Sequence, residues 1–248
     1  MTSVLSPSTL RAMGQKEYEK RKHAALEVEA LVRELHAANE EDKVEAIVEQ
    51  LSKELAASAH SNLRKGALHA LSGAAIGMRN DVKRVLSRLL PPVLAAFADQ
   101  DARVRYTACE ALYNIAKIAR SACVPHINGI FDGLFKLSAD TDPQVQNGMQ
   151  LLDRLMKDVV TESDAFNMDD FMPLLGERIY VSNPFSRQFL VGWISALDSV
   201  PDIDMLTYLP VYFDGLFHML AVTSMEIRQQ SYSVLSDLLR DISDAAES

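Results

Sequence analysis

Apolar residues recur at every third or fourth position along most of the chain, a spacing typical of one face of an α-helix. The segment VEAIVEQLSKEL, for example, places Val44, Ile47, Val48, Leu51 and Leu55 on one stripe. The alternation of apolar and polar residues that marks a half-buried strand is absent from the sequence. The pattern predicts helices over residues 16–37, 41–57, 62–77, 80–98, 102–119, 124–138, 143–160, 168–180, 184–199, 204–220 and 226–242.

The segments between these helices are short and carry Asp, Asn, Ser or Pro, as in ADQDAR, ADTDPQ and SNPFS. Pro143 follows an aspartate and Pro184 follows an asparagine. An acidic or amide side chain followed by proline is the usual order of an N-cap and the first helical residue. The sequence therefore predicts capped helices joined by tight turns.

The helical pattern repeats itself every 41 residues. Three sets of residues share this spacing: Leu63, Val104, Val145, Ser186 and Ile227; Arg64, Arg105, Gln146, Arg187 and Arg228; and Ala67, Ala108, Met149, Leu190 and Ser231. The pentamer FDGLF occurs at 131–135 and again at 213–217, two periods apart. We expect each copy to lie in the first helix of a repeat.

A period of about 40–47 residues made of two helices is typical of HEAT and armadillo repeats. In the segment DARVRYTACEAL we expect the aspartate to cap the second helix of a repeat, the arginine to reach the neighbouring turn, and Leu112 to fill the core. The predicted fold class is all-α, a right-handed α-solenoid of HEAT/armadillo-type repeats, with about five repeats of about 41 residues and an N-terminal cap.

The predicted organisation has four parts. A flexible N-terminus at 1–15 is followed by N-terminal capping helices at 16–58, HEAT repeats at 59–242 and a frayed C-terminus at 243–248. The segment 16–57 is more charged than the rest and fits the 41-residue register poorly, as a terminal cap should.

Composition narrows the possible functions. The 248-residue chain has a formal net charge of −9, which argues against a nucleic-acid surface. It has no run of about 18 apolar residues that could span a membrane, and its first 30 residues lack the apolar core of a signal peptide. The two cysteines, Cys109 and Cys123, lie in helical apolar patterns and are expected to be buried. These features predict a cytoplasmic protein.

No catalytic chemistry is indicated. The six histidines form no metal-binding spacing, and no phosphate-binding loop or nucleophile motif is present. The sequence therefore predicts no cofactor, no metal site and no enzyme activity.

One segment is locally basic. GMRNDVKRVLSRLLPP carries Arg79, Lys83, Arg84 and Arg88 within one predicted helix. These residues are a candidate site for anionic lipid or an acidic partner, while the alternative interpretation is a solvated outer face.

Several long segments closely resemble one family, among them YEKRKHAALEVEALVRE, NLRKGALHALSGAAIGM, DARVRYTACEALYNIAK and LLDRLMKDVVTES. It is the vacuole-morphology HEAT-repeat scaffold family of the phosphatidylinositol 3-phosphate 5-kinase (PIKfyve) complex. The resemblance covers most of residues 16–240 and is to the N-terminal part of that family. It implies a non-catalytic scaffold, peripheral and indirectly held on endosome, vacuole and lysosome membranes, which supports synthesis of phosphatidylinositol 3,5-bisphosphate.

The resemblance also implies where the kinase binds. Residues 60–165 match the kinase-binding stretch, and the candidate contacts are Arg103, Arg105, Leu152, Arg154, Leu155 and Met156. The family's longer proteins bind a Sac-type lipid phosphatase and self-associate through a C-terminal region that this chain lacks, so a fragment, a truncated product and a short protein all remain open.

Two other functions remain possible from the sequence. One is a generic HEAT-repeat adaptor that shares only the fold. The other is a peripheral adaptor that binds anionic lipid through the segment Arg79–Arg88.

Overall fold

The computed structural model describes residues 3–247, with side chains described as far as residue 243. This part of the chain contains helices and no strand, so the all-α prediction is confirmed. The α-helices are α1 (Pro7–Met13), α2 (Tyr18–Ala37), α3 (Glu41–Gln50), α4 (Ser61–Met78), α5 (Leu86–Ala95), α6 (Ala102–Ala119), α7 (Ile127–Ser138), α8 (Pro143–Thr161), α9 (Met168–Gly176), α10 (Pro184–Asp198), α11 (Leu209–Leu220) and α12 (Met225–Glu247).

Five short helical turns connect or extend these helices. Their bounds are η1 (Leu51–Leu55), η2 (Arg79–Arg84), η3 (Ala96–Ala98), η4 (Arg120–His126) and η5 (Met205–Tyr208). The turn η1 is a π-helix that continues α3, and the other four are 3₁₀ helices.

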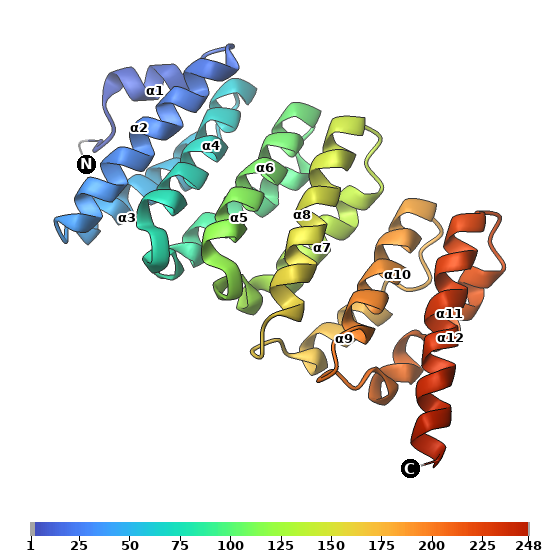
Figure 1. The fold of residues 1–248 in the computed structure, drawn as a ribbon. Helices are drawn as coiled ribbons and strands as arrows, with labels where there is room; N and C mark the ends of the chain where they lie inside the picture. Colours follow the sequence, from blue (N-terminus) through green and yellow to red (C-terminus); the bar gives the residue numbers. More distant parts are fainter. Residues whose placement is uncertain (1–2, 248) are drawn as a thin grey trace. The chain divides into compact units, whose positions relative to one another are not determined.

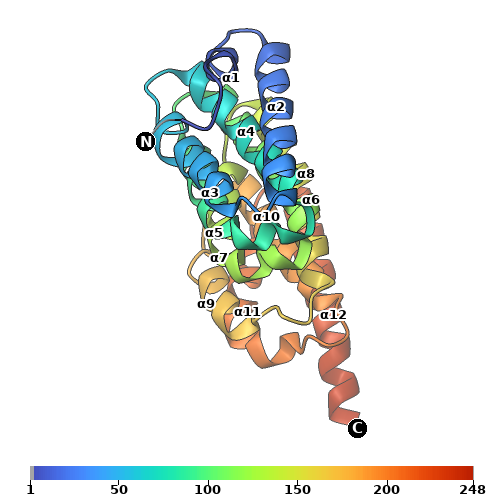
Figure 2. The same cartoon turned by 90° about the vertical axis from the view of Figure 1, so that its left-hand side faces the viewer.

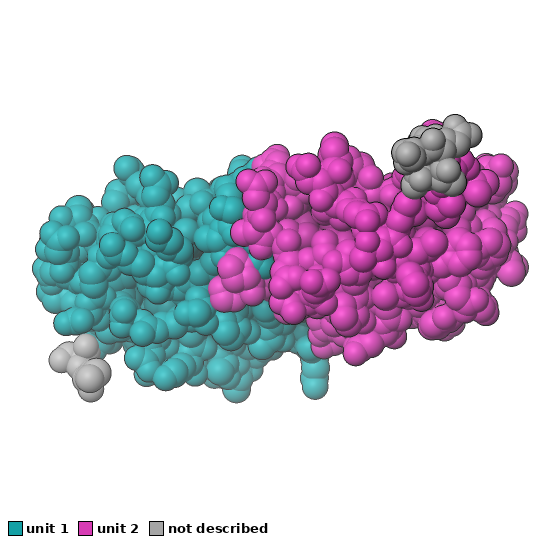
Figure 3. Space-filling view, turned by 90° about the horizontal axis from the view of Figure 1, so that it is seen from below, with its two compact units in different colours: residues 1–124, 140–156 teal, residues 125–139, 157–248 magenta. Residues whose placement is uncertain are grey.

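The chain divides into two compact units, coloured separately in Figure 3. Unit 1 contains Met1–Val124 and Asp140–Met156, and unit 2 contains Pro125–Ala139 and Lys157–Ser248.

Unit 1 is built from two layers of helices. In Figures 1 and 2, α2, α4 and α6 lie side by side in one layer, with α3 and α5 in the other. Each layer contributes fully buried apolar side chains, such as Val48 of α3, Leu71 of α4 and Leu112 of α6. Leu112 therefore fills the core, as the repeat pattern predicts.

Unit 2 repeats the same arrangement. Helices α7, α9 and α11 form one layer and pack against α10 and α12 (Figure 1). Both FDGLF segments lie in the first helix of a pair, in α7 and in α11, as expected. Paired helices at the predicted register establish the HEAT/armadillo-type repeat solenoid as the fold class.

The 41-residue register appears again in one repeated hydrogen bond. Arg64 Nη1 donates to the carbonyl oxygens of Ser58 and Ala59, at 2.9 and 3.1 Å. The other residues of this register position bond to a carbonyl of the preceding turn in the same way: Arg105, Gln146, Arg187 and Arg228. The predicted reach of this residue to the inter-helix turn is confirmed.

The repeated bond extends into the segment predicted as a cap. Arg21 Nη1 donates to the carbonyl oxygens of Gln15 and Lys16, each at 2.8 Å. Helices α1 and α2 thus meet at a turn fastened like the turns of the predicted repeats. The sequence register missed this similarity because Arg21 precedes Arg64 by 43 residues rather than 41.

Two of these arginines also bind a carboxylate in the next inter-helix turn. Arg64 Nε lies 2.7 Å from Asp99 Oδ2, and Arg105 Nε lies 2.6 Å from Asp140 Oδ2. Burial is the largest single influence on the Asp140 carboxyl and raises its pKa. The hydrogen bond and charge of Arg105, together with the backbone N–H groups of Asp142 and Thr141, outweigh burial, so that this pKa lies below its usual value. The pKa of Asp99 is lowered in the same way by Arg64.

These lowered pKa values predict an acid-sensitive unit 1. The two carboxylates contribute stability that is fully present above the unfolded-state pKa of about 4 and is lost as the pH falls through the lowered folded-state pKa. Between about pH 6 and about pH 3, the urea midpoint of the wild type should therefore fall further than that of Asp140→Asn, which lacks one of these acids. Equal falls in the two midpoints, followed by circular dichroism, would contradict this assignment.

The structure differs from the sequence prediction at both ends. The segment 1–15 was expected to be flexible, but residues 7–13 form α1, whose Met13 is fully buried. Ser6 caps this helix by accepting from the Thr9 backbone N–H at 3.1 Å, and proline follows it at the first helical position. At the other end α12 runs to Glu247 rather than ending at 242, so the frayed segment 243–248 is not observed; Ser248 lies outside the described residues.

Candidate interaction surface

The predicted partner-binding residues lie on α6 and α8, and burial separates them. Arg103 and Arg154 are exposed, and Leu155 is half-buried. Leu152 and Met156 are both 0% exposed. Neither can contact a partner while α8 stays packed, which corrects the expectation for these two residues.

Arg105 is also unavailable as a simple surface contact. Its guanidinium is fastened between the carbonyl oxygens of Asp99 and Gln100 and the carboxylate of Asp140. Its role in the structure is to join two successive inter-helix turns.

Leu151, rather than the buried Leu152, is the exposed leucine of α8. It is 59% exposed and lies on the same face as Arg154 and Leu155, three and four residues further along the helix. Helical periodicity alone places Leu151 and Leu152 on one apolar face, because it does not show which side of a helix is covered. The exposed face of α8 is thus formed by Leu151, Arg154 and Leu155.

The basic segment does not form one helical stripe. Arg79 ends α4 at a φ of 50°, Lys83 and Arg84 lie in η2, and Arg88 lies in α5. The 3₁₀ turn η2 ends at Arg84 and α5 begins at Leu86, which corrects the single helix expected over 80–98.

Two of these four cations are paired with acids from α3. Arg84 Nη1 lies 3.5 Å from Glu41, and Arg88 Nη1 lies 2.7 Å from Glu45. Lys83 is exposed. Pairing with carboxylates reduces the positive charge that this segment offers to an anionic lipid surface.

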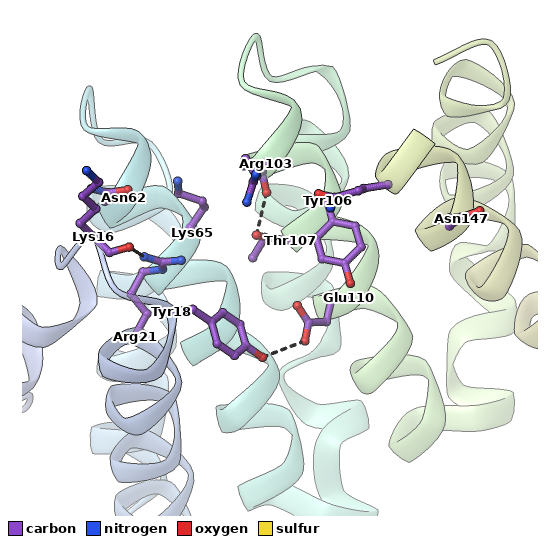
Figure 4. A pocket seen from close by; sticks show the side chains of 11 residues that line it. Lys16, Tyr18, Arg21, Asn62, Lys65, Arg103, Tyr106, Thr107, Glu110 and Asn147 are labelled. Carbon is purple, nitrogen blue, oxygen red and sulfur yellow. Dashed lines mark hydrogen bonds between the residues drawn. The ribbon is translucent and has the colours of Figure 1, made fainter. Parts of the chain in front are cut away.

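A groove of about 710 Å³ opens in unit 1 across the layer formed by α2, α4, α6 and α8 (Figure 4). Its lining consists of Lys16, Tyr18, Arg21, Asn62, Lys65, Arg103, Tyr106, Thr107, Glu110, Gln144 and Asn147. Tyr18 donates to the carboxylate of Glu110 at 3.4 Å across it. Burial raises the pKa of Glu110, the only acidic side chain in the lining.

The groove follows the 41-residue register. Asn62, Arg103 and Gln144 occupy one register position in three successive helices, and Lys65, Tyr106 and Asn147 occupy another. Of these six residues the sequence reasoning singled out Arg103 alone. The other five could have been found from the 41-residue spacing, because polar residues recur at these two exposed register positions just as apolar residues recur at the buried ones.

Two further findings concern the part of the chain that the structure describes. None of its helices is long and apolar enough to cross a membrane. It also holds no group of three His, Cys, Asp or Glu side chains arranged to bind a metal ion.

Comparison with known proteins places this surface in a named region. Residues 62–158, which include α4, α6 and most of α8, match the family described as "Vacuolar 14 Fab1-binding region". The exposed face of α8 and most of the groove lining fall inside the matched residues.

Similar proteins match almost the whole chain. "Protein VAC14 homolog" of Arabidopsis thaliana is 51% identical over 98% of this chain and 33% of its own length. "Vacuole morphology and inheritance protein 14" of Saccharomyces cerevisiae is 36% identical over 96% of this chain and 32% of its own length. The chain thus spans about a third of the length of these relatives.

Among solved structures, one titled for Kap95p binding to RanGDP resembles the fold. It has a TM-score of 0.57 and 15% sequence identity, and the match covers 94% of this chain and 30% of that one. At this identity the likeness concerns the fold alone.

Proposed function

We propose that this chain is a non-catalytic scaffold that binds a Fab1-type lipid kinase, because it is similar to VAC14 proteins over about a third of their length. The observation that carries the proposal is the match of residues 62–158 to a Fab1-binding region. The kinase implied is of the PIKfyve type, which makes phosphatidylinositol 3,5-bisphosphate, and the site of action is the cytoplasmic surface of endosomal and vacuolar membranes.

The exposed face of α8 is the part of the matched region that best suits a protein contact. It combines an apolar side chain, Leu151, with the cationic Arg154 and the half-buried Leu155. Arginine and large apolar side chains that become desolvated supply most of the energy of many protein interfaces. We therefore assign the kinase contact to the exposed face of α8.

A scaffold of this kind acts by raising effective concentration. A kinase held on one part of a long repeat protein meets other bound proteins without separate diffusional encounters. On this proposal, the Sac-type phosphatase and further copies of the scaffold bind elsewhere on the relatives' length.

The proposal is tested by pulling down a Fab1-type kinase with the purified chain and two leucine variants. Leu151→Arg adds a charge to the proposed contact without disturbing the core and should weaken kinase binding by about tenfold or more. Leu239→Arg is the matched control, because Leu239 is 64% exposed on α12, outside the matched residues. Equal kinase binding by both folded variants would exclude the α8 face as the contact, and no binding by the wild type would overturn the proposal.

A further inference from the structure

The groove across α2, α4, α6 and α8 carries an unbalanced positive charge in a chain whose net charge is −9. Four cations line it, Lys16, Arg21, Lys65 and Arg103, against the single carboxylate of Glu110. The nearest acid to Lys65 is Asp101, at 4.0 Å. Among the described residues no carboxylate pairs with the side chains of Lys16 or Arg103.

Burial and the positive charges of the groove lower the pKa values of two neighbouring basic side chains, Lys65 and His69. Burial lowers the pKa of Lys65, Asp101 opposes this, and the charges of Arg21 and Arg103 lower the pKa further. Burial and then the charge of Arg21 lower the pKa of His69, on the adjoining turn of α4, to about 4. Cations that lower one another's pKa values are stabilised when an anion binds among them.

One cation in the groove has a donor with no partner. Arg21 is only 7% exposed, and in the described part of the chain its Nε meets no hydrogen-bond acceptor. Its Nη1 donates to the carbonyl oxygens of Gln15 and Lys16, which holds the guanidinium in place (Figure 4). A buried N–H without an acceptor costs free energy, so the charge of Arg21 is held beside the groove at a cost to stability.

Primary amides lie beside the cations on α4 and α8, the two helices on either side of α6. Asn62 of α4 and Gln144 and Asn147 of α8 line the groove, and within the described residues their side-chain amides have no hydrogen-bond partner in the chain. A primary amide presents both a donor and an acceptor, which are the two groups that each peptide unit of an extended chain offers. Amides on α4 and α8 can therefore bond to separate peptide units of one bound strand that crosses α6.

We propose that this groove binds an extended acidic segment of a partner protein, with its carboxylates on Lys65, Arg103 and Arg21 and its backbone on the amides of Asn62, Gln144 and Asn147. The proposal goes beyond the kinase contact on α8 and does not require that the kinase supply the segment. A lipid headgroup fits less well, because the polar lining extends over four helices whereas a headgroup is compact. The 710 Å³ volume lies within the usual range for ligand sites, about 300–1,000 Å³.

The test uses a fluorescein-labelled peptide of eight alternating glutamate and alanine residues, with the alternating lysine and alanine peptide as its opposite-charge control. Fluorescence polarisation at low salt should show saturable binding of the acidic peptide to the purified chain, weakening as salt screens the charges. The double variant Lys65→Glu/Arg103→Glu should bind the acidic peptide at least about tenfold more weakly. The matched control, Lys43→Glu/Lys53→Glu, changes the net charge equally on α3 and η1, away from the groove, and should bind like the wild type.

Each outcome decides the proposal. Equal weakening in both double variants would show that only net charge matters and would overturn it, as would no binding of the acidic peptide. Binding of the wild type to phosphatidylserine vesicles but not to the peptide would assign the groove to lipid instead. Photo-crosslinking of the peptide to the wild type needs no variant to fold, and should label residues 62–65, 103–107 and 144–147; labels confined to other segments would also overturn the proposal.

Discussion

Replacing Trp193 with alanine lowers the free energy of unfolding of unit 2 by about 3–5 kcal/mol, the usual cost of removing a buried tryptophan side chain. Trp193 is 0% exposed in α10. Its ring centroid lies 5.4 Å from those of Phe131 in α7 and Phe171 in α9. The indole thus fills the space where three helices meet, and the surrounding rings cannot close the cavity without moving a helix.

The loss is measured by urea unfolding followed by circular dichroism. Trp193→Phe is the matched control, because it keeps an aromatic ring in the same position and should lose much less stability than the alanine variant. If Trp193→Ala unfolded at the wild-type urea concentration, the aromatic cluster could not be the core of unit 2.

Replacing Gly73 with leucine should destabilise unit 1 by about 3 kcal/mol, near the upper end of the usual cost of overpacking. A Cβ atom built on Gly73 in α4 would lie 2.5 Å from the carbonyl oxygen of Ala25 in α2. That oxygen belongs to helix backbone, so the clash cannot be relieved by turning a side chain. The absence of a side chain at Gly73 is what allows α2 and α4 to pack at this distance.

A second glycine provides the control for this result. Gly14 is exposed, and a Cβ atom there would meet its nearest atoms at 3.8 and 3.9 Å, which is ordinary van der Waals contact. Gly14→Leu should therefore change the thermal midpoint by far less than Gly73→Leu. Similar midpoints for the two variants would contradict the close contact of α2 with α4.

Periodicity predicted the helices of this fold because each one packs at least one apolar stripe into the layer opposite. The sequence also predicted the 41-residue register. Arg64 and Arg105 occupy the same register position, and each makes the same hydrogen bonds to the preceding turn of its repeat. Helix α1 was missed because seven residues, PSTLRAM, are too few to show a helical period. Whether an apolar residue on α8 is covered or exposed depends on the neighbouring helices. The sequence alone therefore predicted a contact at Leu152, which is buried, and not at Leu151, which is exposed.

Ser231 occupies a buried register position that holds apolar residues in the two preceding repeats. The sequence places a hydroxyl where the preceding repeats have Leu190 and Met149, which predicts a weakly packed last repeat. In the structure the Ser231 side chain is 0% exposed and, within the described residues, its Oγ has no hydrogen-bond partner. An unpaired buried hydroxyl of this kind destabilises its surroundings.

The interaction surface was only partly predictable. The residues matched by the family model, 62–158, lie within the stretch 60–165 that the family resemblance predicts for kinase binding. The charges that offset the basic segment come from Glu41 and Glu45, which are far from Arg84 and Arg88 in the sequence. Such pairings depend on helix packing and cannot be read from a local pattern.

The central claim, that the exposed face of α8 contacts a Fab1-type kinase, is tested most directly by cysteine protection. Both native cysteines are buried, and burial raises the pKa of each thiol to about 12, so neither reacts readily with an alkylating reagent. New cysteines at Leu151→Cys and Leu239→Cys replace leucines of similar exposure, 59% and 64%. The kinase should slow alkylation at position 151 by about tenfold or more while leaving position 239 unchanged; unchanged alkylation at 151 with the kinase bound would contradict the claim.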